Sequence, residues 1–338
     1  MSKSINWKNL GFEYRPTNCF VMSEYRNGRW GTLKTQKDPY VRLHIGATCL
    51  HYGQACFEGL KAFSQKNGGI ALFRPDANAR RLGDSARRIA MIAPPVELFV
   101  KAVTMAVKKN REFVPPYGTR ASLYVRPLLI GATPRIGLQP ADDYLFLVMV
   151  TPAGPYYKHG FSPVNAIVQD EYDRAAPRGV GNVKVAGNYA AGLLGGLTAK
   201  KKGYAVELYL DSAERKFVDE FGTSNFFGIT KTGHYVTPAS TSVLPSITNL
   251  SLQQIARDLG MPVEKRRIAF SELPKFKEIG ACGTAAVITP IYSIANGKKV
   301  ITFGKPDQAG QTLTELFTTL QQIQYGEIKD PHGWMVRI

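Results

Sequence analysis

Near its middle the chain changes character, and this change limits how the whole chain can fold. Residues 144–150 form an almost continuous apolar run, which is typical of a strand buried on both faces. The next segment, 151–163, contains three prolines and two glycines together with Tyr156 and Tyr157, and this composition favours a linker. A chain of 338 residues is long enough for two moderate domains. We therefore expect a domain at 1–153, an interdomain loop at 154–163 and a second domain at 164–338.

Hydrophobic periodicity predicts both helices and hairpin-connected strands in the two halves. Asp76 is placed to cap a helix whose apolar face carries Ala79, Leu82 and Ala86, and a second helix begins at Val96. This mixture favours an α+β fold over a doubly wound parallel sheet. We expect further strands at 70–73, 121–131, 144–150, 164–168, 205–210 and within 217–230, and further helices after Asn188 and from Ile247 and Gln311.

The charge balance is strongly basic. The chain has 43 Lys and Arg residues against 26 Asp and Glu, which gives a formal net charge of +17. A clustered basic patch or tail would indicate nucleic-acid binding, but no recognised nucleic-acid-binding module is present, and the basic residues fall in short groups along the whole chain. We interpret these groups as solvated faces and expect no nucleic-acid partner. They are Arg80-Arg81, Arg87-Arg88, Lys108-Lys109, Lys200-Lys201-Lys202, Lys265-Arg266-Arg267 and Lys298-Lys299.

Several common classes of protein do not fit the sequence. No segment approaches the roughly 18 apolar residues of a membrane span, and the N-terminus lacks the apolar core of a signal peptide, so we expect no membrane partner and a cytoplasmic location. Neither a P-loop nor a GxGxxG motif is present. The spacing of Cys49, His51 and Cys56 matches no usual zinc pattern, and with Cys19 and Cys282 the cysteines are too few for a disulfide framework. We predict no metal.

Two charged residues stand in runs of small or apolar residues. Lys184 is the only charge within residues 179–196. A desolvated lysine offers a free amine that can form a Schiff base with a carbonyl, whereas a lysine at the end of a strand extends its amine to water. Glu220 lies in a strand-like run, where a carboxylate is either at a sheet edge or aimed at a cationic partner. The residues alone favour the amine that extends to water for Lys184, and they leave both alternatives open for Glu220.

Two further segments are candidates for holding a ligand. The turn and helix at 244–260 would offer backbone N–H groups and the Thr248 hydroxyl to a phosphate, although Thr248 is equally suited to capping the helix. The small residues at 281–286 would let the backbone approach a ligand closely, or would serve a crowded strand crossing.

Eight segments, taken in order along the chain, resemble those of a known enzyme family. They are LHYGQACFEGLKAF (50–63), FRPDANARRLGDSA, ASLYVRPLLIG, DRAAPRGVGNVKVAGNY, VDEFGTSNFF, LPSITN, GTAAVITP and IQYGEIKDPHGW. Together they cover nearly the whole chain. The chain therefore resembles the branched-chain amino acid aminotransferases, which are pyridoxal 5′-phosphate enzymes of fold type IV.

This resemblance implies a fold and a reaction. The fold has a smaller N-terminal α+β domain and a larger, pseudo-barrel-like α/β domain that binds the cofactor, and the enzyme is a homodimer. The reaction is the reversible transfer of an amino group from L-leucine, L-isoleucine or L-valine to 2-oxoglutarate, in a ping-pong sequence through a Schiff base at Lys184. A D-amino-acid aminotransferase or an aminodeoxychorismate lyase of the same fold class is the alternative, since either would share Lys184 and Glu220.

The resemblance also assigns cofactor-binding roles. Lys184 forms the Schiff base and then carries the proton between the substrate Cα and C4′ of the cofactor. Glu220 pairs with the pyridine nitrogen, and Tyr189 bonds the phenolic oxygen. The phosphate would be held by a guanidinium, a helix N-terminus and a hydroxyl, supplied by Arg81, Ile247, Thr248 and Thr284.

Substrate-binding positions follow in the same way. Arg126 corresponds to the family arginine associated with the distal carboxylate of glutamate, and Tyr156 lies in the loop that shields the site. An aromatic wall around the aliphatic side chain would be formed by Tyr52, Phe57 and Tyr124. The positions where the family holds the α-carboxylate and forms the pocket edge are Thr223, Thr284 and Ala285.

The chain departs from the family at two places. Ser246 and Asn249 flank Ile247 and Thr248 where the family often has Gly and Arg. The phosphate site is therefore expected to differ in its fine geometry. The CxxC of some eukaryotic relatives is absent, so thiol redox regulation is not implied.

Overall fold

The computed structural model describes residues 5–7, 10–154 and 160–338. The chain forms two compact units. As far as their residues are described, the first unit combines Met1–Lys158 with Lys184–Gly187 and Gln322–Ile338, and the second combines His159–Val183 with Asn188–Gln321.

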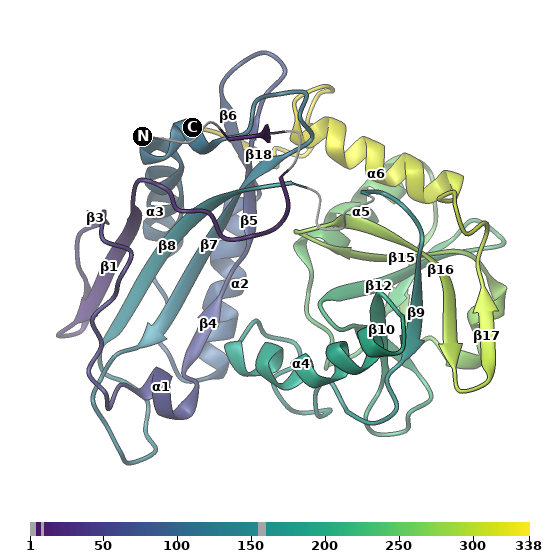
Figure 1. Cartoon of the computed structure of the whole chain (residues 1–338), viewed down its shortest axis with the longest axis horizontal. Coiled ribbons are helices and arrows are strands. Elements are labelled where there is room, and N and C mark those ends of the chain that lie inside the picture. The colour runs from purple at the N-terminus through teal and green to yellow at the C-terminus, as the bar shows by residue number, and fades with distance from the viewer. Residues whose placement is uncertain (1–4, 8–9, 155–159) are drawn as a thin grey trace. The chain divides into compact units, whose positions relative to one another are not determined.

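The first unit is an antiparallel sheet with helices on one face (Figure 1). Its strands are β1 (Phe20–Arg26), β2 (Arg29–Trp30), β3 (Lys34–Gln36), β4 (Ala55–Phe57), β5 (Leu60–Ser64), β6 (Ile70–Phe73), β7 (Ser122–Gly131), β8 (Tyr144–Ala153) and β18 (Met335–Arg337), and its helices are α1 (Thr48–Tyr52), α2 (Pro75–Arg88), α3 (Val96–Lys109) and the 3₁₀ turn Arg111–Phe113. The strand order is β18-β6-β5-β7-β8-β1-β2, with β4 paired to β7 and β3 to β1.

The packing of α3 shows which face of this sheet is covered. Phe99 of α3 stacks on Phe146 of β8 with ring centroids 5.7 Å apart, and both rings are fully buried. Phe146 lies opposite Leu129 of β7, and paired residues of antiparallel strands point to the same face. Because side chains alternate along a strand, the odd-numbered residues of β7 face the helix and the even-numbered residues face away from it.

The second unit contains a closed ring of strands. Its elements are β9 (Val164–Val168), β10 (Val206–Leu210), β11 (Val218–Phe221), β12 (Ser224–Thr230), β13 (Tyr235–Pro238), α5 (Ile247–Asp258), β14 (Val263–Arg266), the 3₁₀ turn Phe270–Lys275, β15 (Phe276–Gly283), β16 (Val287–Asn296), β17 (Lys299–Thr302) and most of α4 (Ala186–Lys201) and α6 (Gln311–Gln324). Neighbouring strands pair in the order β11-β10-β9-β16-β15-β12, and β12 also pairs with β11, which closes the ring. The α+β class with a pseudo-barrel-like second domain is therefore confirmed.

The division into units differs from the expected boundaries because two later segments join the first unit. β18 pairs with β6, and the backbone N–H of Lys66 donates to the carbonyl of Tyr325 at 2.8 Å. The N–H of Phe57 donates to the carbonyl of Lys184 at 3.1 Å. The lysine segment and the end of the chain therefore belong with the first unit, although both follow residue 164 in the sequence.

Two helix starts also differ from the prediction. α2 begins at Pro75 after Arg74, which has a left-handed backbone (φ 49°), and none of the described side chains caps it, so the prediction that Asp76 caps this helix is wrong. α4 begins at Ala186, before Asn188. Within the described residues, none of the helices is both long enough and apolar enough to cross a membrane.

Candidate active site

Three predicted substrate-binding residues share one face of the first unit's sheet. Phe57 of β4 lies opposite Leu128 of β7. Tyr124 and Arg126 lie four and two residues before Leu128 on the same strand, so all three side chains belong to the face turned away from α3. Gly59 leaves room for this arrangement, because a Cβ there would lie 2.0 Å from the Tyr124 hydroxyl.

Two cationic groups contact the Phe57 ring. Lys184 Nζ and Arg126 Cζ each lie 4.7 Å from its centroid. Arg126 Cζ also lies 5.3 Å from the Tyr124 centroid, and its Nη2 donates to the Tyr124 hydroxyl at 3.0 Å. Arg126 Nε is buried and has no hydrogen-bond partner among the described residues. We call Phe57, Tyr124, Arg126 and Lys184 the Phe57 cluster; it combines an apolar aromatic surface with an N–H suited to a carboxylate.

Backbone contacts place Lys184 in this cluster. Its N–H donates to Ser85 Oγ at 2.9 Å, its carbonyl accepts the Phe57 N–H, and Val185 forms a β-bridge with Cys56. The Lys184 side chain is half-buried. The lysine is therefore tied to β4 next to the ring that its amine contacts.

Arg81 is held by a buried carboxylate. Its Nε donates to Glu58 Oε1 and its Nη2 to Glu58 Oε2, both at 2.8 Å. Glu58 Oε2 also accepts hydrogen bonds from Asn78 Nδ2 (2.7 Å) and from the N–H of Gly59 (3.3 Å). The paired bonds fix the plane of the Arg81 guanidinium.

The three predicted tyrosines outside this cluster have different surroundings. Tyr52 ends α1, is 41% exposed, and donates its hydroxyl hydrogen to the carbonyl of Ile136. Tyr189 is half-buried in the first turn of α4. Tyr156 lies outside the described residues.

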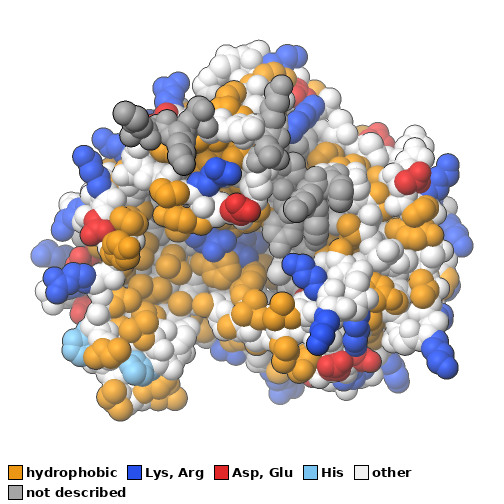
Figure 2. Space-filling view, viewed as in Figure 1, with side chains coloured by type: hydrophobic (Ala, Val, Ile, Leu, Met, Phe, Trp, Pro, Cys, Tyr) orange, Lys and Arg blue, Asp and Glu red, His pale blue; other side chains and the backbone are white. Residues whose placement is uncertain are grey.

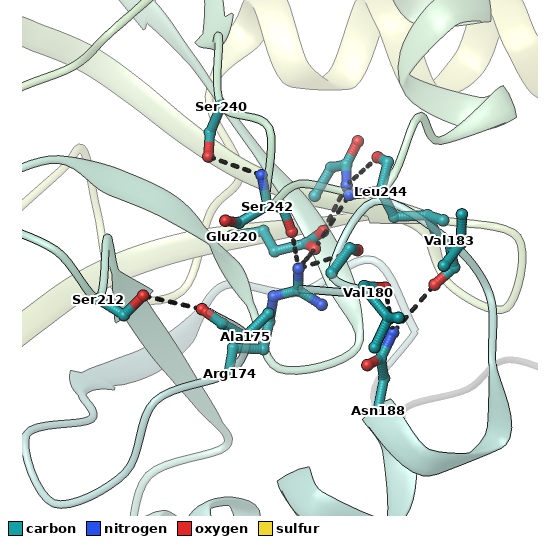
Figure 3. A network of polar contacts seen from close by, with 12 residues as sticks. Arg174, Ala175, Val180, Val183, Asn188, Ser212, Glu220, Ser240, Ser242 and Leu244 are labelled. Carbon is teal, nitrogen blue, oxygen red and sulfur yellow. Dashed lines mark hydrogen bonds and ion pairs between the residues drawn. The ribbon is translucent and has the colours of Figure 1, made fainter. Parts of the chain in front are cut away.

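In the second unit, Glu220 is buried in a polar network (Figure 3). Its Oε1 accepts the N–H of Leu244 at 3.2 Å and forms an ion pair with Arg174 Nη2 at 2.8 Å. Its Oε2 accepts Asn225 Nδ2 at 2.6 Å. Because β11 pairs with strands on both sides, Glu220 is not at a sheet edge, and the alternative of a cationic partner holds.

Burial and neighbouring charge act against each other at Glu220. Burial raises the pKa of this carboxyl group above its ordinary value, while Arg174 and the donors Leu244 and Asn225 oppose the rise. The neighbouring thiol of Cys282 has a pKa well above its ordinary value, because it is buried and close to the Glu220 charge. Cys282 is therefore a neutral neighbour of the carboxylate.

The predicted residues Thr223, Thr284 and Ala285 lie in two turns at one end of the strand ring. Asn225 pairs with Cys282 across β12 and β15, so the turn before β12 lies beside the turn after β15. A Cβ added at Gly283 would lie 3.9 Å from the carbonyl oxygen of Thr223, which is ordinary contact. A side chain would fit at position 283, so crowding between strands does not explain this glycine. The alternative, a close approach of the backbone to a ligand, stays a prediction.

The start of α5 holds the predicted Ile247 and Thr248, both buried. Ser246 is the N-cap, and its Oγ accepts the N–H of Asn249 at 3.3 Å, so the alternative that Thr248 caps the helix is wrong. Asn249 Nδ2 donates to Asn225 Oδ1 at 3.1 Å. The departure from the family at position 249 thus orients the amide that bonds Glu220.

Sequence reasoning missed Glu58, Arg174 and Asn225. It named Asn249 as a departure from the family but did not predict its hydrogen bond to Asn225. Glu58 and Arg174 lie within segments that carry the family resemblance, FEGLK and DRAAPRG, and each is a charge near buried strands. That pattern signals a buried ion pair but does not identify its partner, because the partner lies at least 23 residues away.

Comparisons with known proteins identify the family. The family model for class IV amino-transferases matches residues 55–294. The chain is 44% identical to the branched-chain-amino-acid aminotransferase of Haemophilus influenzae over 342 residues, which cover 99% of both chains. The chain belongs to the branched-chain-amino-acid aminotransferase family. It is therefore a transaminase, and the resemblance of the eight segments is confirmed.

Solved structures of this family share the fold. The branched-chain amino acid aminotransferase of Escherichia coli matches with a TM-score of 0.81 and 25% identity over 95% of this chain and 99% of that one. The T.th. branched-chain amino acid aminotransferase, complexed with N-(5′-phosphopyridoxyl)-L-glutamate, matches with a TM-score of 0.77 and 25% identity over 95% and 98% of the two chains. The ligand in that complex joins the cofactor skeleton to glutamate.

Proposed function

We propose that this transaminase transfers the amino group of L-leucine, L-isoleucine or L-valine to 2-oxoglutarate, reversibly and in a ping-pong sequence. The Phe57 cluster carries the proposal. Its aromatic rings offer an apolar surface for a branched side chain, and the buried Nε of Arg126 offers an N–H to the distal carboxylate of glutamate. One site that serves two such different side chains needs both features.

Pyridoxal 5′-phosphate is the cofactor, and when bound it supplies an aldehyde that accepts the amino group and a ring that accepts electrons from the substrate Cα–H bond. The second unit fits its ring nitrogen, because Glu220 is buried and accepts three hydrogen bonds or ion pairs where a carboxylate can accept about four. The remaining acceptor direction is on Oε2.

The other residues proposed to hold the cofactor follow the chemistry of its parts. Lys184 Nζ would bond the aldehyde carbon and move the proton at the substrate Cα, and Tyr189 would donate to the phenolic oxygen. The phosphate would be bound by the Arg81 guanidinium and by the buried start of α5. The proposed phosphate ligands are completed by Ile247, Thr248 and Thr284. The proposed substrate site is completed by Tyr52, Thr223 and Ala285.

We also propose a homodimer in the cytoplasm. Figure 2 shows hydrophobic side chains gathered over α1 and the loop between β7 and β8. Within the first unit, each of the apolar side chains Tyr40, Ile45, Ile136 and Leu138 is more than three quarters exposed. Such a patch supports coverage by a second copy of the chain. Sedimentation at twice the mass of one chain is expected, and a monomer at micromolar concentration would contradict the dimer.

A panel of amino donors tests the substrate assignment. With 2-oxoglutarate as acceptor, purified protein should form glutamate from L-leucine, L-isoleucine and L-valine, and D-alanine and aminodeoxychorismate should react at least about a hundredfold more slowly in kcat/KM. A preference for either of the last two would replace the proposal by the alternative within the same fold class.

Lys184→Ala tests the role of the lysine. The protein as purified should absorb visible light through its bound cofactor, and the variant should lose both the covalent attachment and transamination, by about 10²-fold or more. Full activity in the variant would remove Lys184 from the mechanism.

A further inference from the structure

Arg174 lies at the centre of the network in Figure 3. Among the described residues, one of its nitrogens, Nη2, makes all three of its polar contacts: the ion pair with Glu220 Oε1, a hydrogen bond to the carbonyl of Gly181 at 3.0 Å, and one to the carbonyl of Ser242. Its Nε is buried and has no hydrogen-bond partner among the described residues. The guanidinium therefore serves the carboxylate as a single donor, not as a paired fork.

These contacts join three segments of the second unit. The first is the loop that ends directly before Lys184 in the sequence, and its carbonyls at Val180 and Val183 also accept hydrogen bonds from Asn188 Nδ2, at 2.7 and 3.0 Å. The second is the segment with Ser242, and the third is β11 with Glu220. Gly181 makes the approach possible, because a Cβ there would lie 2.7 Å from Arg174 Nη2.

We propose, resting on the proposed function, that Arg174 is a positioning residue that keeps Glu220 charged and fixes its Oε1, so that Oε2 is left to bind the ring nitrogen of the cofactor. A buried carboxylate without a counter-charge would take up a proton, and a protonated carboxyl group does not stabilise a positively charged ring nitrogen. Asp219, the neighbouring acid on β11, adds to the need for a positive charge, since it also favours the protonated form of Glu220.

The contact pattern predicts which substitutions preserve this role. Lysine has three donors on one nitrogen, and Arg174 uses one nitrogen for three contacts, so Arg174→Lys should replace it. Arg174→Met keeps the length of the side chain and removes its charge. Arg215→Met is the matched control, because Arg215 also donates to backbone, at 2.6 Å to the carbonyl of Asp170, and is not paired with Glu220.

The experiment measures the affinity of the cofactor-free protein for pyridoxal 5′-phosphate and the position of the visible band of the loaded protein. Arg174→Met should weaken binding about tenfold to a hundredfold and shift the band, whereas Arg174→Lys and Arg215→Met should stay within about threefold of the unchanged protein. If Arg174→Met does not fold, Arg174→Gln makes the same neutral comparison with Arg174→Lys.

A second background separates positioning from a structural role. If Arg174 acts through the charge of Glu220, then Arg174→Met should change the affinity less than about threefold when Glu220→Gln is already present. Equal losses in both backgrounds, no loss in either, or failure of Arg174→Lys to restore binding would each overturn the inference. Absence of cofactor binding by the unchanged protein would instead overturn the proposed function.

Discussion

Each unit of the molecule buries one glutamate beside one arginine, and the two pairs are built differently. In the first unit, Glu58 binds Arg81 through two parallel hydrogen bonds, one to each carboxylate oxygen, and accepts two more on Oε2. In the second unit, Glu220 binds Arg174 through one oxygen and accepts three bonds in total.

The two pairs differ in which residue is oriented by the other: the arginine in the first unit and the glutamate in the second. The Arg81 guanidinium engages both oxygens of Glu58, so the effect of Glu58 is to orient Arg81, a candidate phosphate ligand. Arg174 is enclosed by carbonyl groups, so its effect is to orient Glu220, a candidate partner of the ring nitrogen. The same two residue types thus prepare a cation for an anion in one unit and an anion for a cation in the other.

Glu220→Gln should have the largest effect, because it removes the carboxylate charge proposed to face the ring nitrogen of the cofactor. A neutral amide does not hold a proton on the ring nitrogen, so we expect kcat/KM to fall about 10²- to 10³-fold in folded protein. The measurement is steady-state transamination at saturating cofactor. A loss that excess cofactor restores would show that Glu220 only assists binding.

Glu58→Gln should show the opposite pattern. It removes the charge opposite the Arg81 guanidinium, so the free energy of unfolding should fall by about 3 kcal/mol, measured by denaturant titration. Activity should fall less than about tenfold once cofactor is in excess. If the activity loss equals that of Glu220→Gln under those conditions, the two pairs do not differ in role.

The sequence predicted the residues proposed to contact cofactor and substrate better than it predicted the buried residues that orient them. Lys184, Phe57 and Arg126 could be grouped because a family resemblance assigned them to one site. The register of β4 with β7 brings Phe57 and Arg126 to one face, and the backbone bond from Phe57 holds Lys184 beside them. The partners Glu58 and Arg174 could not be assigned, since a buried charge has no periodicity of its own and its counter-charge comes from a distant segment. Asn249 was noticed as a departure from the family, but its bond to Asn225 depends on tertiary packing.

A buried lysine, Lys61, extends the comparison within the first unit. Lys61 of β5 lies opposite Tyr124, and burial lowers its pKa from 10.5 to about 8. Between these values the unfolded chain binds more protons than the folded one, so this group makes the folded state more stable as pH rises. Relative to Lys61→Met, the free energy of unfolding should therefore increase by about 2–3 kcal/mol from pH 7.5 to 10.

Denaturant titrations at both pH values make this measurement, and Lys108→Met is the control. Lys108 is exposed on α3, so its removal should leave the pH dependence parallel to that of the unchanged protein. Parallel curves for Lys61→Met as well would mean that the Lys61 ammonium is compensated in the folded state.

Substitutions of one glycine near each arginine should have the smallest effects among these variants. A Cβ at Gly181 would lie 2.3 Å from the carbonyl oxygen of Ser242 and 2.7 Å from Arg174 Nη2, so Gly181→Ala should destabilise the protein by about 1–3 kcal/mol and weaken cofactor binding. Gly83, two residues after Arg81 in α2, has no described atom within 4 Å of an added Cβ. Gly83→Ala should therefore stabilise the helix by about 0.5–1 kcal/mol and leave cofactor binding unchanged. Thermal unfolding and cofactor titration of both variants distinguish these outcomes; shifts of the same sign would show that Arg174 is no more tightly enclosed than Arg81.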